Sequence, residues 1–146
     1  MKGMLIWPQL WPNLPQMASN VSHLFLKVIY IFCECNARKE PNQCNQCLQE
    51  FLKYVSQMPK LKRLDIKWIE GFPDMDSQSL NLFTELNVLT LDGYKNVKEL
   101  VAFIQNCIEK RMSEKNMSLD LDESVRGELK DTLKAMGVSV PKYLFI

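Results

Sequence analysis

Four cysteines in one short stretch are the residues in this chain best suited to metal chemistry. They form a Cys-x-Cys pair and a Cys-x-x-Cys pair with eight residues between them. Tetrahedral zinc accepts four thiolates, although common zinc modules place two Cys-x-x-Cys pairs about fifteen or more residues apart. Two hypotheses stay open. Either these are loop thiols with Cys47 buried in a helix, or the chain binds zinc, as its sole cofactor, through Cys33, Cys35, Cys44 and Cys47.

Catalytic chemistry has little support in the sequence. His23 is the single histidine, and no pattern places it beside a cysteine as a general base would have to be. The acidic run 120–123 is short and does not define two carboxylates with separate roles. The five glycines form no phosphate-binding loop. We therefore expect a non-enzymatic protein.

The composition is that of one globular domain. The chain has 146 residues, 47% hydrophobic and 24% charged, with a net charge of +1. This balance argues against nucleic acid as a partner, because such proteins are basic. The longest apolar run, Leu24–Phe32, is about half of the roughly 20 residues that a membrane span needs. An odd cysteine count argues against a secreted disulfide scaffold and predicts an intracellular protein, cytoplasmic or nuclear.

A short apolar motif, Leu-x-x-Leu-x-Leu or a variant of it, recurs along the chain and is called the phrase below. Its fourth and sixth positions lie on one side of a strand, because side chains alternate, and an apolar stretch follows most copies. Such strand-plus-helix units stack with their strands parallel. The copies begin at residues 21, 61, 86 and 116, so their spacing is uneven, and the longest interval contains the cysteine loop 33–47. Pro141-x-x-Leu144-x-Ile146 is a candidate fifth copy.

Local signals place the elements around this phrase. Asn96 can cap a helix, and Gly137 stands where a helix ends. The prolines in residues 7–15 exclude a helix interior, so residues 1–20 are interpreted as a Pro/Trp-rich N-terminal cap or a partial repeat. Residues 21–146 then form about four to five irregular repeats. We expect strands at 21–31, 61–66 with an extension to 68 left open, 86–91 and 117–121, and a strand-like tail at 138–146. Helices are expected at 44–58, 97–112 and 123–136, with at most a short helical turn at 76–82.

The phrases Leu61-x-x-Leu64-x-Ile66 and Leu86-x-x-Leu89-x-Leu91 resemble the leucine-rich repeat superfamily. Over residues 21–146 the chain is most similar to the irregular ribonuclease-inhibitor-like and F-box/leucine-rich-repeat type. The resemblance implies an α/β fold, a short strand-helix solenoid with parallel strands on the concave side and helices on the convex side. It also implies a protein partner on the concave face, as in substrate recognition by a ubiquitin-ligase-type assembly. The alternative fold is an ordinary α/β domain with amphipathic strands.

The phrase also predicts which side chains would meet a partner. Its second, third, fifth and seventh positions face away from the helices and run from basic to acidic along the chain, a pattern that sets partner choice or is only a solvated face. The partner-binding candidates are His23, Phe25, Lys27, Lys62, Arg63, Asp65, Lys67, Asn87, Thr90, Asp92, Asp120 and Asp122.

Three further expectations concern aromatic anchors, the last strand and the cysteine loop. Trp68 and Tyr94 follow two strands, either as anchors for a partner or packed against loops. An uncovered last strand at 144–146 would pair with a second copy or with further repeats. The alternative function is a small zinc-stabilised α/β adaptor that uses Cys33, Cys35, Cys44 and Cys47.

Overall fold

Five parallel strands lie side by side in the order in which they occur along the chain. The computed structural model describes residues 8–28, 45–68, 75–110 and 116–146. Each strand pairs in parallel with the one that follows it. The strands are β1 (His23–Val28), β2 (Arg63–Trp68), β3 (Val88–Asp92), β4 (Met117–Leu121) and β5 (Leu144–Phe145). The fold is therefore α/β with an all-parallel sheet, as the sequence predicts.

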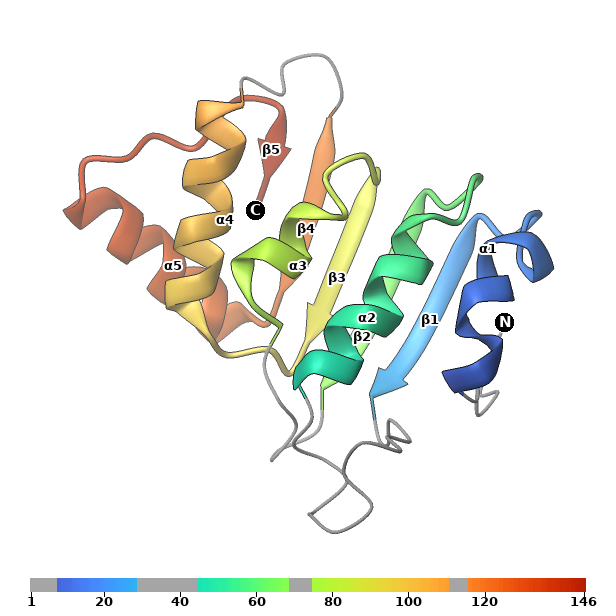
Figure 1. Ribbon diagram of the computed structural model, residues 1–146. Coiled ribbons are helices and arrows are strands. Elements are labelled where there is room, and N and C mark those ends of the chain that lie inside the picture. The colour runs from blue at the N-terminus through green and yellow to red at the C-terminus, as the bar shows by residue number, and fades with distance from the viewer. Residues whose placement is uncertain (1–7, 29–44, 69–74, 111–115) are drawn as a thin grey trace, which may run out of the picture.

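The helices cover one face of this sheet (Figure 1). Parallel neighbours in sequential order require a crossover after every strand, and crossovers of one hand leave their helices on the same side. The opposite face carries no helix in the described part of the chain (Figure 1). The helical elements are η1 (Pro8–Asn13), α1 (Leu14–Met17), α2 (Asn45–Ser56), α3 (Ser77–Asn81), α4 (Val97–Glu109) and α5 (Glu123–Ala135).

Caps at the helix ends confirm two of the sequence signals. The Asn96 side chain accepts a hydrogen bond from the Glu99 N–H at 3.3 Å, which satisfies one free donor of the first turn of α4. Gly137 follows α5 with φ +71°, a left-handed conformation that glycine adopts without strain. Local sequence therefore determines where α4 begins and where α5 ends.

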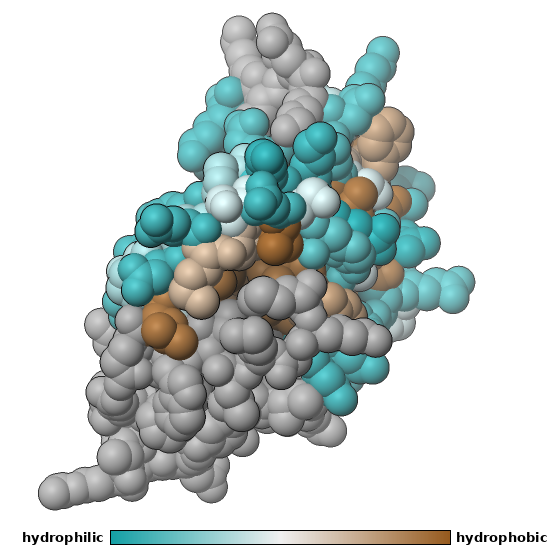
Figure 2. Space-filling model, turned by 90° about the vertical axis from the view of Figure 1, so that its right-hand side faces the viewer, coloured by the Kyte–Doolittle hydropathy of each residue, from teal (hydrophilic) through white to brown (hydrophobic). Residues whose placement is uncertain are grey.

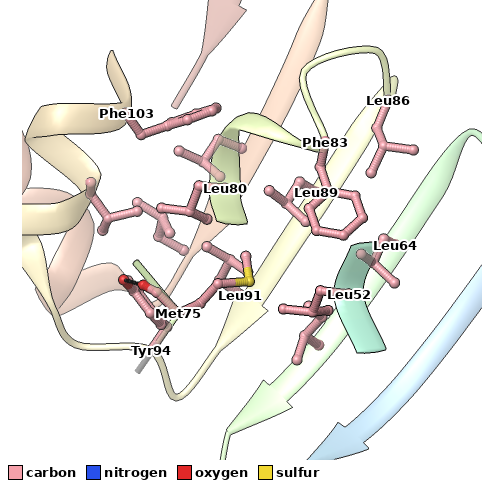
Figure 3. Close-up of a cluster of buried hydrophobic side chains, with 14 of the residues drawn as sticks. Leu52, Leu64, Met75, Leu80, Phe83, Leu86, Leu89, Leu91, Tyr94 and Phe103 are labelled. Carbon is pink, nitrogen blue, oxygen red and sulfur yellow. Dashed lines mark hydrogen bonds between the residues drawn. The ribbon is translucent and has the colours of Figure 1, made fainter. Parts of the chain in front are cut away.

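The hydrophobic core lies between the sheet and the helices. The fourth and sixth positions of the phrase in β2, β3 and β4 are at most 6% exposed, and the Phe83 ring lies beside Leu89 (Figure 3). Each buried side chain of this size contributes about 1.5–3 kcal/mol relative to its exposed state. The fourth- and sixth-position residues of β2, β3 and β4 in this core are Leu64, Ile66, Leu89, Leu91, Leu119 and Leu121.

The N-terminal segment closes the core at the β1 end. Its prolines do not prevent helical structure, because the helices are short and Pro15 occupies the first turn of α1, where no hydrogen-bonded N–H is required. Trp11 is 4% exposed and packs on Phe51 of α2, with ring centroids 5.3 Å apart. Leu14 is buried beside them.

The strand-like prediction for residues 138–146 is wrong in length and in register. Only Leu144 and Phe145 form a strand, and Pro141 cannot donate to a ladder. Leu144 pairs with Met117, whereas a fifth copy in register would pair Leu144 with Leu119. Four copies are in register, and β5 is displaced by two residues.

Two expectations fall wholly or partly outside the described residues. The predicted strand 21–31 is observed as His23–Val28, and residues 29–31 are not described. Of the cysteine loop 33–47, only the backbone of residues 45–47 is described, as the start of α2. Among the described residues, no helix is long and apolar enough to cross a bilayer.

Candidate functional site

The sheet face opposite the helices, called here the open face, carries side chains in three rows that cross the strands. The rows follow from the pairing of the strands, and they alternate with the buried leucines. Ordered from β1 towards β5, they are His23, Arg63, Val88, Ser118 and Phe145; then Phe25, Asp65, Thr90 and Asp120; then Lys27, Lys67 and Asp92.

Asp65 is the best-anchored polar residue of the open face. Its Oδ2 lies 2.7 Å from His23 Nε2, and Arg63 Nε donates to Oδ1 at 3.1 Å. Only 12% of the Asp65 side chain is exposed, against 51% for His23 and 47% for Arg63. Burial by itself raises the pKa of Asp65, but hydrogen bonds from Thr90, His23 and Arg63 and the Arg63 charge outweigh it. The pKa is therefore lowered, and the carboxylate stays ionised.

The acidic side chains further along the sheet are held more loosely. Asp120 accepts hydrogen bonds from Ser118 Oγ at 3.3 Å and from Thr90 Oγ1 at 3.4 Å, and it is exposed. Lys67 Nζ lies 4.0 Å from Asp92 Oδ2, and both side chains are about half exposed. Exposed pairs at such distances contribute little to stability, so these charges remain available to a partner.

Charge on the open face is divided between its two halves. The β1–β2 half holds Lys27, Lys67 and Arg63, and Arg63 is paired with Asp65, the one carboxylate that the described residues place there. The β3–β4 half holds Asp92 and Asp120. Such a separation of charge sets the orientation of an approaching charged surface.

Three candidate residues lie at the ends of the strands rather than on the face. Lys62 and Asn87 are exposed and stand one residue before β2 and β3, where the Asn87 N–H donates to the Lys62 carbonyl at 2.8 Å. Asp122 follows β4 and is half-buried, and its Oδ2 accepts the Gly93 N–H at 3.1 Å. Asp122 therefore ties the turn after β3 to the start of α5.

Trp68 and Tyr94 are not available to a partner, so the anchor hypothesis for them is wrong. Trp68 is 7% and Tyr94 0% exposed, and their rings meet edge to face at 5.2 Å. The Tyr94 hydroxyl donates to the Met75 carbonyl. Gly93 makes this packing possible, because its φ is +80° and a Cβ there would lie 2.7 Å from the Trp68 carbonyl oxygen.

Among the described residues, Phe25 and Phe145 expose aromatic rings on the open face, at 41% and 55%. Phe145 was missed in the sequence. Phe25 is the fifth residue of its phrase, and Phe145 is the fifth residue of the candidate copy that begins at Pro141. Because β5 is displaced by two residues and side chains alternate, Phe145 still lies on the open face. Seen from the side of η1, α1 and β1, apolar side chains lie at the surface among hydrophilic ones (Figure 2).

The described part of the chain contains neither a group of metal ligands nor an activated cysteine thiol. Within it, no group of three or more His, Cys, Asp or Glu side chains is placed to hold a metal ion. Cys33, Cys35 and Cys44 lie outside the described residues, as does the Cys47 side chain, so the zinc hypothesis stays a prediction. Cys107 is buried, and burial raises the pKa of its thiol, which disfavours the reactive thiolate.

Fold and face together define a class: an α/β protein with a repeat-like parallel sheet, one face covered by helices and one polar face uncovered by the described residues. The chain matches no family model, and no curated protein or solved structure matches it.

Proposed function

We propose that this protein is a non-enzymatic binding module that holds a protein partner on the open face. The observation that carries the proposal is the contrast between the two faces of one sheet. One face is covered by helices, while the other presents exposed Lys27, Lys67, Asp92 and Asp120 with no helix over them among the described residues. An exposed face with an aromatic side chain and separated charges is suited to protein recognition.

We further propose that the module is a short leucine-rich-repeat-like solenoid whose concave side is the open face. Four phrase copies in register and helices confined to one side support this proposal. The narrower hypothesis, substrate recognition in a ubiquitin-ligase-type assembly, has its support in the resemblance to F-box/leucine-rich-repeat proteins.

Matched charge reversals test the use of the open face. One variant changes Lys27 and Lys67 on the open face, and Lys62 at its edge just before β2, to Glu. The control changes three exposed lysines on the helices to Glu: Lys53, Lys98 and Lys130. Both variants alter the net charge equally, so a general charge effect acts on both.

The assay is quantitative affinity capture from a lysate of the source cells, with circular dichroism to show that both variants are folded. We expect at least one protein captured by the wild type to fall about tenfold or more with the open-face variant and to stay within about twofold with the control. Capture that both triple variants retain equally would show that the open face is not the binding surface.

A further inference from the structure

The charge pattern of the open face is complementary to itself. Basic side chains occupy its β1–β2 half and acidic side chains its β3–β4 half. A partner surface would match it if acidic side chains lay opposite β1–β2 and basic side chains lay opposite β3–β4. The open face of a second copy presents this order when it is rotated by half a turn to face the first. We propose that the partner held on the open face is a second copy of this chain, an inference that rests on the proposed function.

The strand order determines which symmetry brings opposite charges together. A twofold axis parallel to the strands, between β2 and β3, places β2 opposite β3 of the second copy and β1 opposite its β4. Lys67 of each copy then faces Asp92 of the other, because the two residues share a register row. Lys27, in the same row, faces the acidic end of β4, where Asp120 and Asp122 lie.

The other face-to-face arrangement is disfavoured by the same charges. A twofold axis perpendicular to the strands, within the interface, would place each strand opposite itself. The basic side chains of β1 and β2 would then lie opposite those of the same two strands, and the acidic side chains of β3 and β4 would lie opposite one another, and like charges held opposite one another repel. Sheets that pack face to face align their strands to within about 30°; both arrangements meet this condition, so the charges decide between them.

The pairing of charged side chains within one copy supports the proposed contacts between copies. Asp65, near the proposed axis, has its charge satisfied within the chain by His23 and Arg63, so it needs nothing from the second copy. Lys67 and Asp92 are 4.0 Å apart and half exposed, so each retains contact surface for a second partner. The symmetry therefore brings together charged groups that are only weakly paired within one copy.

Complementary variants test this arrangement. Variant A carries Lys27→Glu and Lys67→Glu, and variant B carries Asp92→Lys and Asp120→Lys. The open face of variant A is then acidic across both halves and that of variant B is basic across both halves. We expect sedimentation velocity to show a wild-type dimer of twice 17.0 kDa, at least tenfold weaker self-association for A and for B, and a restored dimer in an equimolar mixture of A and B.

A milder pair of variants keeps the test valid where four changed charges would disturb folding. Lys67→Glu alone places like charges opposite one another, and we expect it to weaken the dimer about tenfold or more. Adding Asp92→Lys restores opposite charges across the axis at the wild-type net charge, and the dimer should return. Raising the salt from 50 to 500 mM should weaken the wild-type dimer, because mobile ions screen exposed charges.

Each remaining outcome overturns the inference. A wild-type monomer at 100 µM in 50 mM salt would exclude the second copy as partner. A dimer that persists in A and B would place the interface elsewhere, and loss of the dimer in both without recovery on mixing would refute the proposed symmetry. The lysate capture tests the proposed function separately. If the wild type is a monomer but captures another protein, and the lysine reversals abolish that capture, then the open face binds a protein and only the proposal of a second copy as partner is refuted.

Discussion

We predict that the contacts of the Asp65 carboxylate with His23 and Arg63 stabilise the fold. The change in the free energy of unfolding on Asp65→Asn measures this contribution. The substitution removes the charge that His23 and Arg63 share at 2.7 and 3.1 Å. A hydrogen bond to a charged group contributes about 1.5–3 kcal/mol when it is buried, and an exposed ion pair about 0.2–1 kcal/mol. Because Asp65 is 12% exposed and its partners are half exposed, we expect a loss of about 1–2 kcal/mol.

The control is Asp120→Asn, the same substitution in the same row of the open face. Asp120 is exposed and its hydrogen bonds are 3.3 and 3.4 Å long, so we expect a loss below about 0.5 kcal/mol. Urea unfolding at pH 7, followed by tryptophan fluorescence, gives both free energies of unfolding, and equal slopes would show that the unfolded states are alike. A difference between the two variants smaller than about 0.3 kcal/mol would refute the assigned role of Asp65.

The lowered pKa of Asp65 adds a pH dependence with a defined sign. The folded state holds the carboxylate ionised to lower pH than the unfolded chain does. Its contribution to stability is therefore fully present above the unfolded carboxyl pKa, about 3.9, and is lost as the pH falls through the lower folded pKa. The stability gap between wild type and Asp65→Asn should hold at neutral pH and shrink below about pH 4. A gap that grows on acidification would show that the pKa is raised instead.

Two further predictions concern the turn after β3. Gly93→Ala should destabilise the protein by about 2–4 kcal/mol, because it combines a left-handed backbone with a Cβ 2.7 Å from the Trp68 carbonyl oxygen. Gly127→Ala in α5, where the added Cβ has no neighbour within 4 Å apart from the adjoining residues and backbone of its own helix, should instead stabilise the protein by about 0.5–1 kcal/mol; thermal unfolding that gave both changes the same sign would contradict this account. Tyr94→Phe removes the hydroxyl that donates to the Met75 carbonyl and should lower the free energy of unfolding by about 1–3 kcal/mol; an unchanged urea midpoint would argue against that hydrogen bond.

The elements that the sequence predicts well are those with signals inside the element itself. The predicted helices 97–112 and 123–136 are observed as Val97–Glu109 and Glu123–Ala135, and the strand 117–121 as Met117–Leu121. The strand predicted in the tail 138–146 is longer than the observed one. Alternating apolar residues indicate which side of a strand a side chain occupies, but not whether a neighbouring strand offers backbone groups for pairing. The displacement of β5 by two residues is likewise a property of the pairing with β4.

The candidate site shows the same division between local and distant determinants. Alternation along each strand correctly places Phe25, Lys67 and Thr90 on the face away from the leucines. The burial of Asp65 could not be predicted that way, since residues of three strands surround it: His23, Arg63 and Thr90. The burial of Trp68 against Tyr94 depends on the left-handed turn at Gly93, which brings two successive units together.

The uneven repeat spacing and the continuous open face are compatible because the insertions leave the strands intact. The phrase copies begin at residues 21, 61, 86 and 116, yet Leu24, Leu64, Leu89 and Leu119 are all paired in one row. One extra residue inside a strand would turn its leucines onto the open face, whereas an insertion after a strand changes only the return path. The register is therefore maintained by burial of the leucines, and the charged rows opposite them are aligned as a consequence. The division of charge between β1–β2 and β3–β4 then depends only on which residue types occupy these aligned positions, so it can change by substitution without disturbing the core.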